Sequence, residues 1–188
     1  MAEELLWIKK NELPLPPQIS NIMKNTTQRI VLTALLTALV CVATMIVKIP
    51  SPLKGYINLG DGVILLAGWI LSPLYGFLAA GIGSALADVF SGYVVYAPAT
   101  FVIKGCMALL SFFLFKLMRK KAKELPSRLV SGISAEVFMV AGYFLFEGLL
   151  YGFAPSAVNI PANAVQGAAG LILGVILVKI FDKSKFRF

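Results

Sequence analysis

The sequence has no histidine and only two cysteines. Without histidine the chain has no imidazole base, which excludes the common Ser-His-Asp triads. Cys41 and Cys106 lie inside apolar runs, so we interpret them as free buried thiols rather than as a disulfide. No His/Cys cluster has the spacing of metal ligands, and no G-x-x-x-x-G-K-[ST] phosphate loop occurs. We therefore expect no metal site, no cofactor and no ATPase site in this chain.

Charged residues are also scarce, at 14% of 188 residues, whereas hydrophobic residues make up 59%. Soluble domains have about 25% charged residues. The mean hydropathy is +0.85, and the apolar residues occur in blocks of roughly twenty, enough for a helix to cross about 30 Å of hydrocarbon. These features predict an all-α, multi-pass membrane protein with one helical bundle, whose net charge of +8 requires no nucleic acid.

The apolar blocks predict six membrane spans. They cover residues 29–48, 59–71, 74–92, 99–118, 129–150 and 159–181. The second span is short, and Pro73 marks the turn after it. Residues 1–28 are polar and lack the apolar core of a signal peptide, so we expect a cytoplasmic leader before a membrane domain at 29–188.

Basic residues indicate the orientation of the bundle. They cluster before the first span, between the fourth and fifth spans, and after the sixth, positions that six spans bring to one side. The positive-inside rule then predicts that both termini are cytoplasmic. Four tyrosines are expected to form an aromatic belt at the outer interface: Tyr56, Tyr93, Tyr96 and Tyr151.

Polar residues within the predicted spans concentrate in the outer half of the bilayer, and only Glu136 lies in the inner half. A charged residue at the centre of a membrane helix costs roughly 2.5–3.5 kcal/mol on insertion scales, so several on one side suggest a cavity. Helical spacing and depth select Thr100, Lys104, Tyr143, Glu147, Asn159, Asn163 and Gln166. Three neighbouring helices are thus predicted to direct polar faces toward one outward-opening pocket.

Structural roles remain open for several polar residues. Lys104 either contacts a ligand or pairs with Asp88 or Glu147. We interpret Asp61, at the start of the second span, as a helix cap, and Asp88 as a structural acid at a helix end. The amides of the sixth span either join helices or line a pocket, and their number in the outer half favours the pocket.

Small residues mark surfaces where helices approach closely. Ala34 and Ala38 form an AxxxA pattern in the first span, and Gly170 and Gly174 a GxxxG pattern in the sixth. The AxxxA surface faces either a neighbouring helix or a partner subunit.

These features together resemble the substrate-binding S component of energy-coupling factor (ECF) transporters. The resemblance covers about residues 29–181 and is carried by the short spans, the AxxxA pattern, GYINLGDGVILLAGWILSPLYGFLAAGIGSALADVFSGY (55–93) and YAPATFVIKG (96–105). Region 55–105 is most similar to the subgroup that handles pyridoxine or hydroxymethylpyrimidine. Pantothenate is a close rival, with riboflavin and cobalamin further away.

The resemblance implies a function and a site. An S component binds a water-soluble vitamin or precursor at the outer side of the bacterial cell membrane and topples in the bilayer to deliver it. It works with a transmembrane coupling subunit and two cytoplasmic ATPases, which bind the ATP. Ala34 and Ala38 would then contact the coupling subunit. Loop 49–58 would cover the ligand, so Asn58 and Tyr96 join the predicted substrate-binding residues.

Alternative functions make different demands on the sequence. A small membrane enzyme would use Glu136, Glu147 and Asp88 as acid/base groups, but the chain has no histidine, metal motif or activated nucleophile. A passive channel would have polar residues through the whole bilayer depth. Lys104 would favour pantothenate by neutralising its carboxylate, unless Lys104 pairs with an acid inside the protein.

Overall fold

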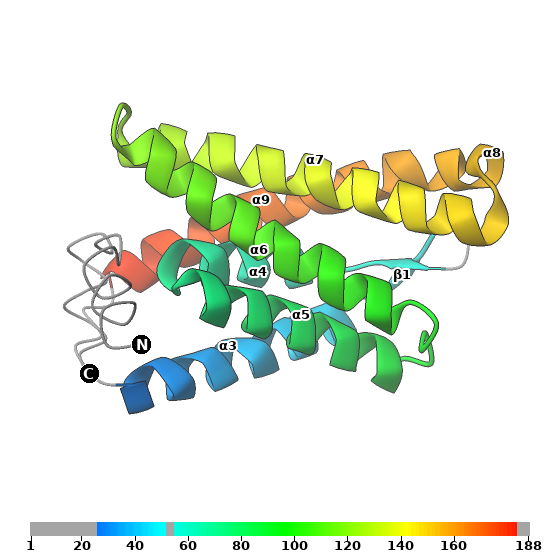
Figure 1. Ribbon diagram of the computed structural model, residues 1–188, viewed down its shortest axis with the longest axis horizontal. Helices are drawn as coiled ribbons and strands as arrows, with labels where there is room; N and C mark the ends of the chain where they lie inside the picture. Colours follow the sequence, from blue (N-terminus) through cyan, green and yellow to red (C-terminus); the bar gives the residue numbers. More distant parts are fainter. Residues whose placement is uncertain (1–25, 52–54, 184–188) are drawn as a thin grey trace, which may run out of the picture.

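The computed structural model describes residues 26–51 and 55–183. Its elements are α3 (Thr26–Ile46), β1 (Ile49–Pro50), β2 (Tyr56–Ile57), α4 (Gly60–Ile70), α5 (Pro73–Phe90), α6 (Ala97–Arg119), α7 (Glu124–Tyr151), α8 (Phe153–Ser156), η1 (Ala157–Asn159) and α9 (Ile160–Lys183). The long helices run side by side along one axis (Figure 1). Most of the expected leader lies outside the described residues, and its residues 26–28 belong to α3.

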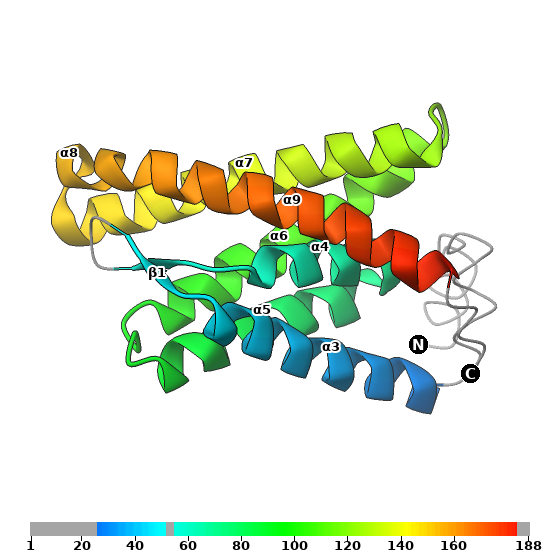
Figure 2. The same cartoon turned by 180° about the vertical axis from the view of Figure 1, so that it is seen from behind.

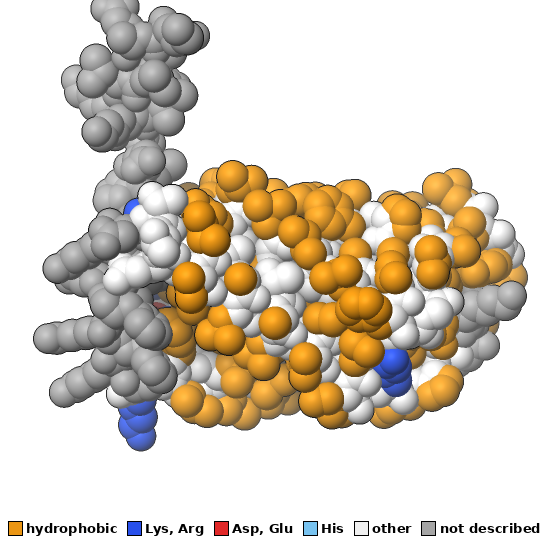
Figure 3. All heavy atoms as spheres, turned by 90° about the horizontal axis from the view of Figure 1, so that it is seen from below, with side chains coloured by type: hydrophobic (Ala, Val, Ile, Leu, Met, Phe, Trp, Pro, Cys, Tyr) orange, Lys and Arg blue, Asp and Glu red, His pale blue; other side chains and the backbone are white. Residues whose placement is uncertain are grey.

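The outer surface of this bundle is apolar. Within the described residues, five helical segments are long and apolar enough to cross a membrane: α3, α5, α6, α7 and Phe153–Lys183. Large side chains such as Leu35 and Ile172 are 61% and 63% exposed. Hydrophobic side chains cover much of the face seen in Figure 3. This surface suits lipid contact and confirms the predicted multi-pass membrane protein.

The second predicted span is a short central helix. α4 has 11 residues, all of them buried, and it contacts α3, α5, α6 and α9. Eleven residues rise about 16 Å, roughly half of a hydrocarbon core of about 30 Å. The prediction of a crossing helix at 59–71 is therefore not confirmed. Its nearly unbroken apolar run instead fits a helix that is surrounded on all sides.

Two glycines show how closely the helices approach. A Cβ on Gly83 of α5 would lie 2.6 Å from the carbonyl oxygen of Thr37 on α3. A Cβ on Gly170 of α9 would lie 2.6 Å from the Asp61 Cβ on α4. The predicted close contacts of small residues are thus confirmed at these positions.

A short hairpin joins α3 to α4. β1 and β2 pair antiparallel, with Ile49 opposite Ile57 and Pro50 opposite Tyr56. The all-α prediction missed them because two-residue strands carry no readable alternation. The hairpin and α8 lie at one end of the bundle, whereas the α6–α7 connection lies at the other (Figures 1 and 2).

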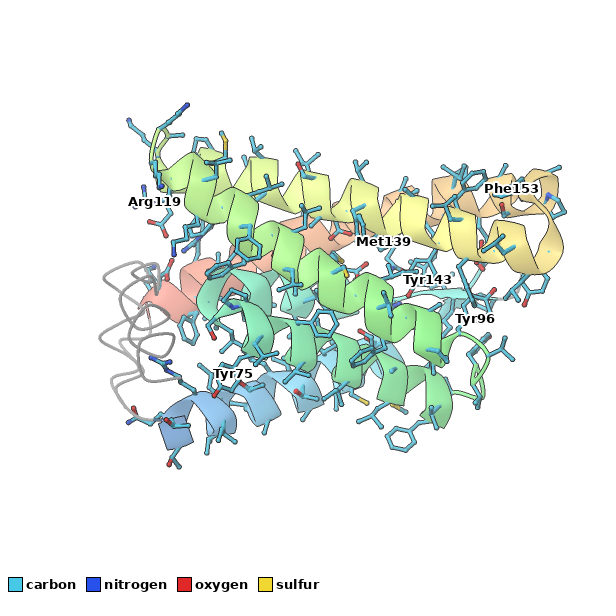
Figure 4. The ribbon with its side chains drawn as sticks, viewed as in Figure 1. Tyr75, Tyr96, Arg119, Met139, Tyr143 and Phe153 are labelled. Carbon is cyan, nitrogen blue, oxygen red and sulfur yellow. The ribbon has the colours of Figure 1, made fainter. Side chains whose placement is uncertain are left out.

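The end with the α6–α7 connection carries basic residues. Arg119 ends α6 there (Figure 4). Arg128 of α7 pairs with Glu124 and, at 2.9 Å, with Asp182 of α9. Arg119 and Arg128 therefore lie at the end of the bundle opposite the hairpin.

Candidate functional site

A small polar cavity lies at the hairpin end of the bundle, among the hairpin, α5, α6, α7 and α9. It has a volume of about 40 Å³, room for ordered water. Its walls consist of Ser51, Gly55, Tyr56, Asn58, Asp88, Tyr93, Tyr96, Thr100, Tyr143, Glu147, Asn163 and Gln166. Polar groups from segments far apart in the sequence therefore converge on one cavity.

Most of the predicted site residues line this cavity. They are Asn58, Tyr96, Thr100, Tyr143, Glu147, Asn163 and Gln166. Lys104 and Asn159 instead lie behind its wall. The Lys104 Nζ is 5.4 Å from the centroid of the Tyr143 ring, and the Asn159 Nδ2 donates to both carboxylate oxygens of Glu147 at 3.0 Å. The ligand-binding role assigned to these residues stays a prediction.

The buried partner of Lys104 is Asp61. Their side chains are 3% and 0% exposed, and the predicted pairing of Lys104 with Asp88 or Glu147 is wrong. Asp61 is at the start of the predicted second span, but α4 lies in the centre of the bundle. Asp61 consequently faces α6 from within the core.

The predicted capping role of Asp61 is also wrong. Its oxygens accept hydrogen bonds from Lys104 and, at 2.6 Å, from the Gln166 Nε2. The Asn58 Oδ1 instead accepts the N–H of Gly60, the first residue of α4, at 2.9 Å. An acid at the second position of a helix can turn its side chain inward when a buried cation offers a stronger partner.

Gln166 links this ion pair to the base of the hairpin. Its Nε2 donates to Asp61, and its Oε1 accepts the backbone N–H of Asn58 at 2.9 Å. Asp61 thereby orients the amide of Gln166, because only one orientation satisfies both contacts. We call Asp61, Lys104, Gln166 and Asn58 the ion-pair network.

Asp88 is a cavity residue that the sequence analysis did not place in the site. It is 5% exposed, and its Oδ1 accepts the Tyr56 hydroxyl at 2.7 Å. Its Oδ2 is buried without a hydrogen-bond partner among the described residues. The sequence pattern that could have identified Asp88 is its i, i+4 spacing from Ser84. Both polar residues are buried on one face of α5.

Tyrosines form part of the cavity wall. The Tyr56 and Tyr93 ring centroids are 4.9 Å apart, and those of Tyr93 and Tyr96 are 6.3 Å apart. The predicted aromatic belt is thus partly a cavity wall, and Tyr96 and Tyr143 both lie near the hairpin (Figure 4). Burial, followed by the neighbouring Asp88 carboxylate, raises the pKa of Tyr56 well above its usual range. Tyr56 therefore stays a hydrogen-bond donor at physiological pH.

The cavity is acidic. Asp88 and Glu147 line it, but no lysine or arginine of the described residues does. The Lys48 Nζ lies 5.7 Å from the Tyr56 ring centroid and donates to the Ser91 hydroxyl. In the described parts of the chain, no group of three or more acidic or cysteine side chains could hold a metal ion.

Glu136 lies apart from the cavity. It lines an apolar groove between α7 and α9. Within the described ranges, neither of its carboxylate oxygens has a hydrogen-bond partner. The enzyme hypothesis needs Glu136, Glu147 and Asp88 in one site, and the structure does not bring Glu136 to the other two.

Ala34 and Ala38 are exposed on α3. They line a groove of about 670 Å³ between α3 and α5 with other apolar side chains. The alternative that they pack inside the bundle is therefore wrong. Contact with a partner subunit stays a prediction.

A membrane bundle with a polar cavity near its end has the form of a binding protein for a small polar solute. Comparison with known proteins identifies the family. Residues 24–183 match the family model described as ECF-type riboflavin transporter, S component. The chain belongs to this family of S components of ECF-type transporters, which are transport proteins rather than enzymes.

Two curated relatives align over most of the chain. A Pyrococcus woesei protein described as "Uncharacterized protein in gap 3'region" is 38% identical over 145 residues, covering 77% of this chain and 95% of its own. The "Thiamine precursor transporter HmpT" of Lactococcus lactis subsp. cremoris (strain MG1363) is 26% identical over 160 residues, covering 84% and 89%.

A solved structure has the same fold. It is described as "Structure and mechanism of the S component of a bacterial ECF transporter", and the TM-score is 0.69 at 23% identity. The similarity covers 84% of this chain and 96% of the other.

Proposed function

We propose that this chain is the specificity subunit of an ECF importer for a small nitrogen heterocycle of the thiamine-precursor class. Hydroxymethylpyrimidine is the first candidate and pyridoxine the second. The observation that carries the proposal is the acidic, tyrosine-lined cavity without a basic side chain among its described walls. The relative described as a thiamine precursor transporter supports the same class.

The charge of the cavity argues against pantothenate. A bound carboxylate would lie close to Asp88 and Glu147, and like charges repel strongly in a dry site. Lys104 was the cation expected to neutralise the carboxylate of pantothenate. Because Lys104 pairs with Asp61 behind the wall, that argument for pantothenate no longer applies.

Riboflavin is the alternative ligand, because the family model's description names it. The size of the cavity favours the pyrimidine ring over the flavin. The cavity has a volume of about 40 Å³ and adjoins a second pocket of about 370 Å³ that shares Tyr93 and Tyr96 with it, so a single pyrimidine ring requires less expansion than a tricyclic flavin.

In this proposal the hairpin end faces outward and the basic end faces the cytoplasm of the cell, as the positive-inside rule favours. Transport then uses the coupling subunit and two ATPases of an ECF module. Ala34 and Ala38 supply a smooth exposed surface for the coupling subunit. Purified chain alone in proteoliposomes should bind solute without ATP-driven accumulation.

Native mass spectrometry of the full chain tests the ligand class. The panel is hydroxymethylpyrimidine, pyridoxine, pantothenate, riboflavin and cobalamin, each at equal concentration. We expect hydroxymethylpyrimidine or pyridoxine to be retained in preference. Preferential retention of pantothenate would contradict the proposal, and retention of riboflavin would replace its ligand.

A further inference from the structure

The two carboxylates of the cavity differ in their unused hydrogen-bonding capacity. Both Glu147 oxygens accept hydrogen bonds from Asn159 at 3.0 Å, and one also faces the Tyr96 hydroxyl at 3.4 Å. Asp88 accepts the Tyr56 hydroxyl on Oδ1 and lies beside the Thr100 side chain, but its Oδ2 has no partner within hydrogen-bond distance among the described residues. Both carboxylate oxygens of Glu147 therefore have hydrogen-bond partners within the protein, whereas the Oδ2 of Asp88 can still accept a hydrogen bond.

No cation within the described residues forms an ion pair with Asp88, and Lys104 and Lys48 act on its carboxylate only from a distance. Lys104 pairs with Asp61, and Lys48 donates to Ser91 beside the Tyr56 ring, which it approaches to 5.7 Å. Asp88 is 5% exposed, so water cannot hydrate its carboxylate freely. A buried carboxylate oxygen without a donor is costly, and such groups normally have a partner in the functional state.

We propose that Asp88 is the residue that recognises the ligand, by accepting a hydrogen bond from a ring amino or ring N–H group on its free Oδ2. The Tyr56 hydroxyl holds Oδ1, which leaves the buried Oδ2 as the acceptor that a ligand would reach when the cavity expands to admit it. Tyr93 and Tyr96, at 6.3 Å between centroids, supply faces for an aromatic ring beside it.

This proposal deepens the proposed function, because it rests on the cavity being the substrate site. It does not require one particular vitamin. Hydroxymethylpyrimidine carries a ring-bound amino group, and riboflavin carries an imide N–H. Either group could donate to Asp88, whereas the carboxylate of pantothenate could not.

The test is calorimetric binding to the full-length protein with two ligands, hydroxymethylpyrimidine and its analogue lacking the amino group. Asp88→Asn keeps the shape of the side chain. Because the Asn oxygen stays with Tyr56, its amide N–H₂ faces the donor of the ligand. We expect a loss of about tenfold to a hundredfold in affinity for hydroxymethylpyrimidine, the size of a buried unpaired donor.

The analogue separates recognition from general damage. It should bind wild type weakly, and Asp88→Asn should weaken it little further, so the two losses are not additive. Equal loss with both ligands, or loss with neither, would overturn the proposal. Ser84→Ala is the matched control, because Ser84 is buried one turn earlier on α5 and does not line the cavity. It should leave both affinities unchanged.

Two further sets of measurements cover the cases in which another ligand binds or the variant does not fold. If riboflavin is the ligand that wild type retains, the proposed class fails, and riboflavin against N3-methylriboflavin becomes the matched pair for Asp88→Asn. If only pantothenate binds, both proposals fail. Should Asp88→Asn not fold, Asp88→Ser keeps a hydroxyl for Tyr56 and carries the same expectation.

Discussion

Two buried polar groups lie close together in this bundle and differ in how far the protein satisfies them. In the ion-pair network, the Asp61 carboxylate meets both Lys104 and Gln166. In the cavity, Asp88 and Glu147 share a space with no basic side chain from the described residues. The comparison indicates that the first group holds helices together, whereas the second is arranged to bind a ligand.

Packing explains why the two groups differ. At the ion-pair network, α9 approaches α4 so closely that a Cβ on Gly170 would lie 2.6 Å from the Asp61 Cβ. No ligand fits there, so the charges must satisfy one another. At the hairpin end, the helices leave a space of about 40 Å³.

Breaking the ion pair should have the largest effect on stability. Lys104→Met or Asp61→Leu leaves one uncompensated buried charge, which costs about 3–5 kcal/mol of unfolding free energy. The double variant removes both charges and should recover most of that loss. Unfolding in detergent micelles measures all three. Single variants that are as stable as wild type would show that the ion pair does not hold the fold.

Two amides on α9 sharpen the comparison, because Gln166 belongs to both groups and Asn163 lines only the cavity. Asn163→Leu should weaken ligand binding by roughly 1–3 kcal/mol and leave thermal stability unchanged. Gln166→Leu should lower both affinity and stability. Unchanged affinity in both variants would remove α9 from the proposed site.

Glu136→Gln should have a small effect. The Glu136 carboxylate lies outside the cavity, and its oxygens have no hydrogen-bond partner in the described chain. A neutral isostere removes a buried charge that lacks hydrogen-bond partners, so thermal stability should not fall, and affinity should not fall because Glu136 does not line the cavity. A fall in affinity comparable with that of Asn163→Leu would bring Glu136 into the site.

Ala38→Trp should have the smallest effect on binding and stability, because Ala38 is exposed and belongs to neither polar group. Uptake by the complete transporter should nevertheless be lost, since a bulky ring would block close approach of the coupling subunit. Ala34→Trp should have the same effects on binding, stability and uptake. Loss of binding together with uptake would contradict the partner-surface prediction.

The sequence predicted the long helices and most of the cavity wall, because helical periodicity survives in each span. For example, Tyr143 and Glu147 follow i, i+4 spacing on α7 and do share a face. The pairing of Lys104 with Asp61 could not be predicted from the sequence. It depends on the position of α4, a short helix that lies in the centre of the bundle and does not span the membrane. Tyr56 and Asp88 were missed because their contact joins the hairpin to α5, and no local pattern encodes that pairing.

The most direct test of the central claim compares two isosteric variants, Asp88→Asn and Asp61→Asn, for ligand affinity and thermal midpoint together. Asp88→Asn is expected to lose affinity for hydroxymethylpyrimidine with an unchanged or higher midpoint. Asp61→Asn should lower the midpoint, because Lys104 then lacks its counter-charge, and leave the affinity of the folded fraction nearly unchanged. Two variants that change the same quantity to the same extent would contradict the division between a structural and a binding group.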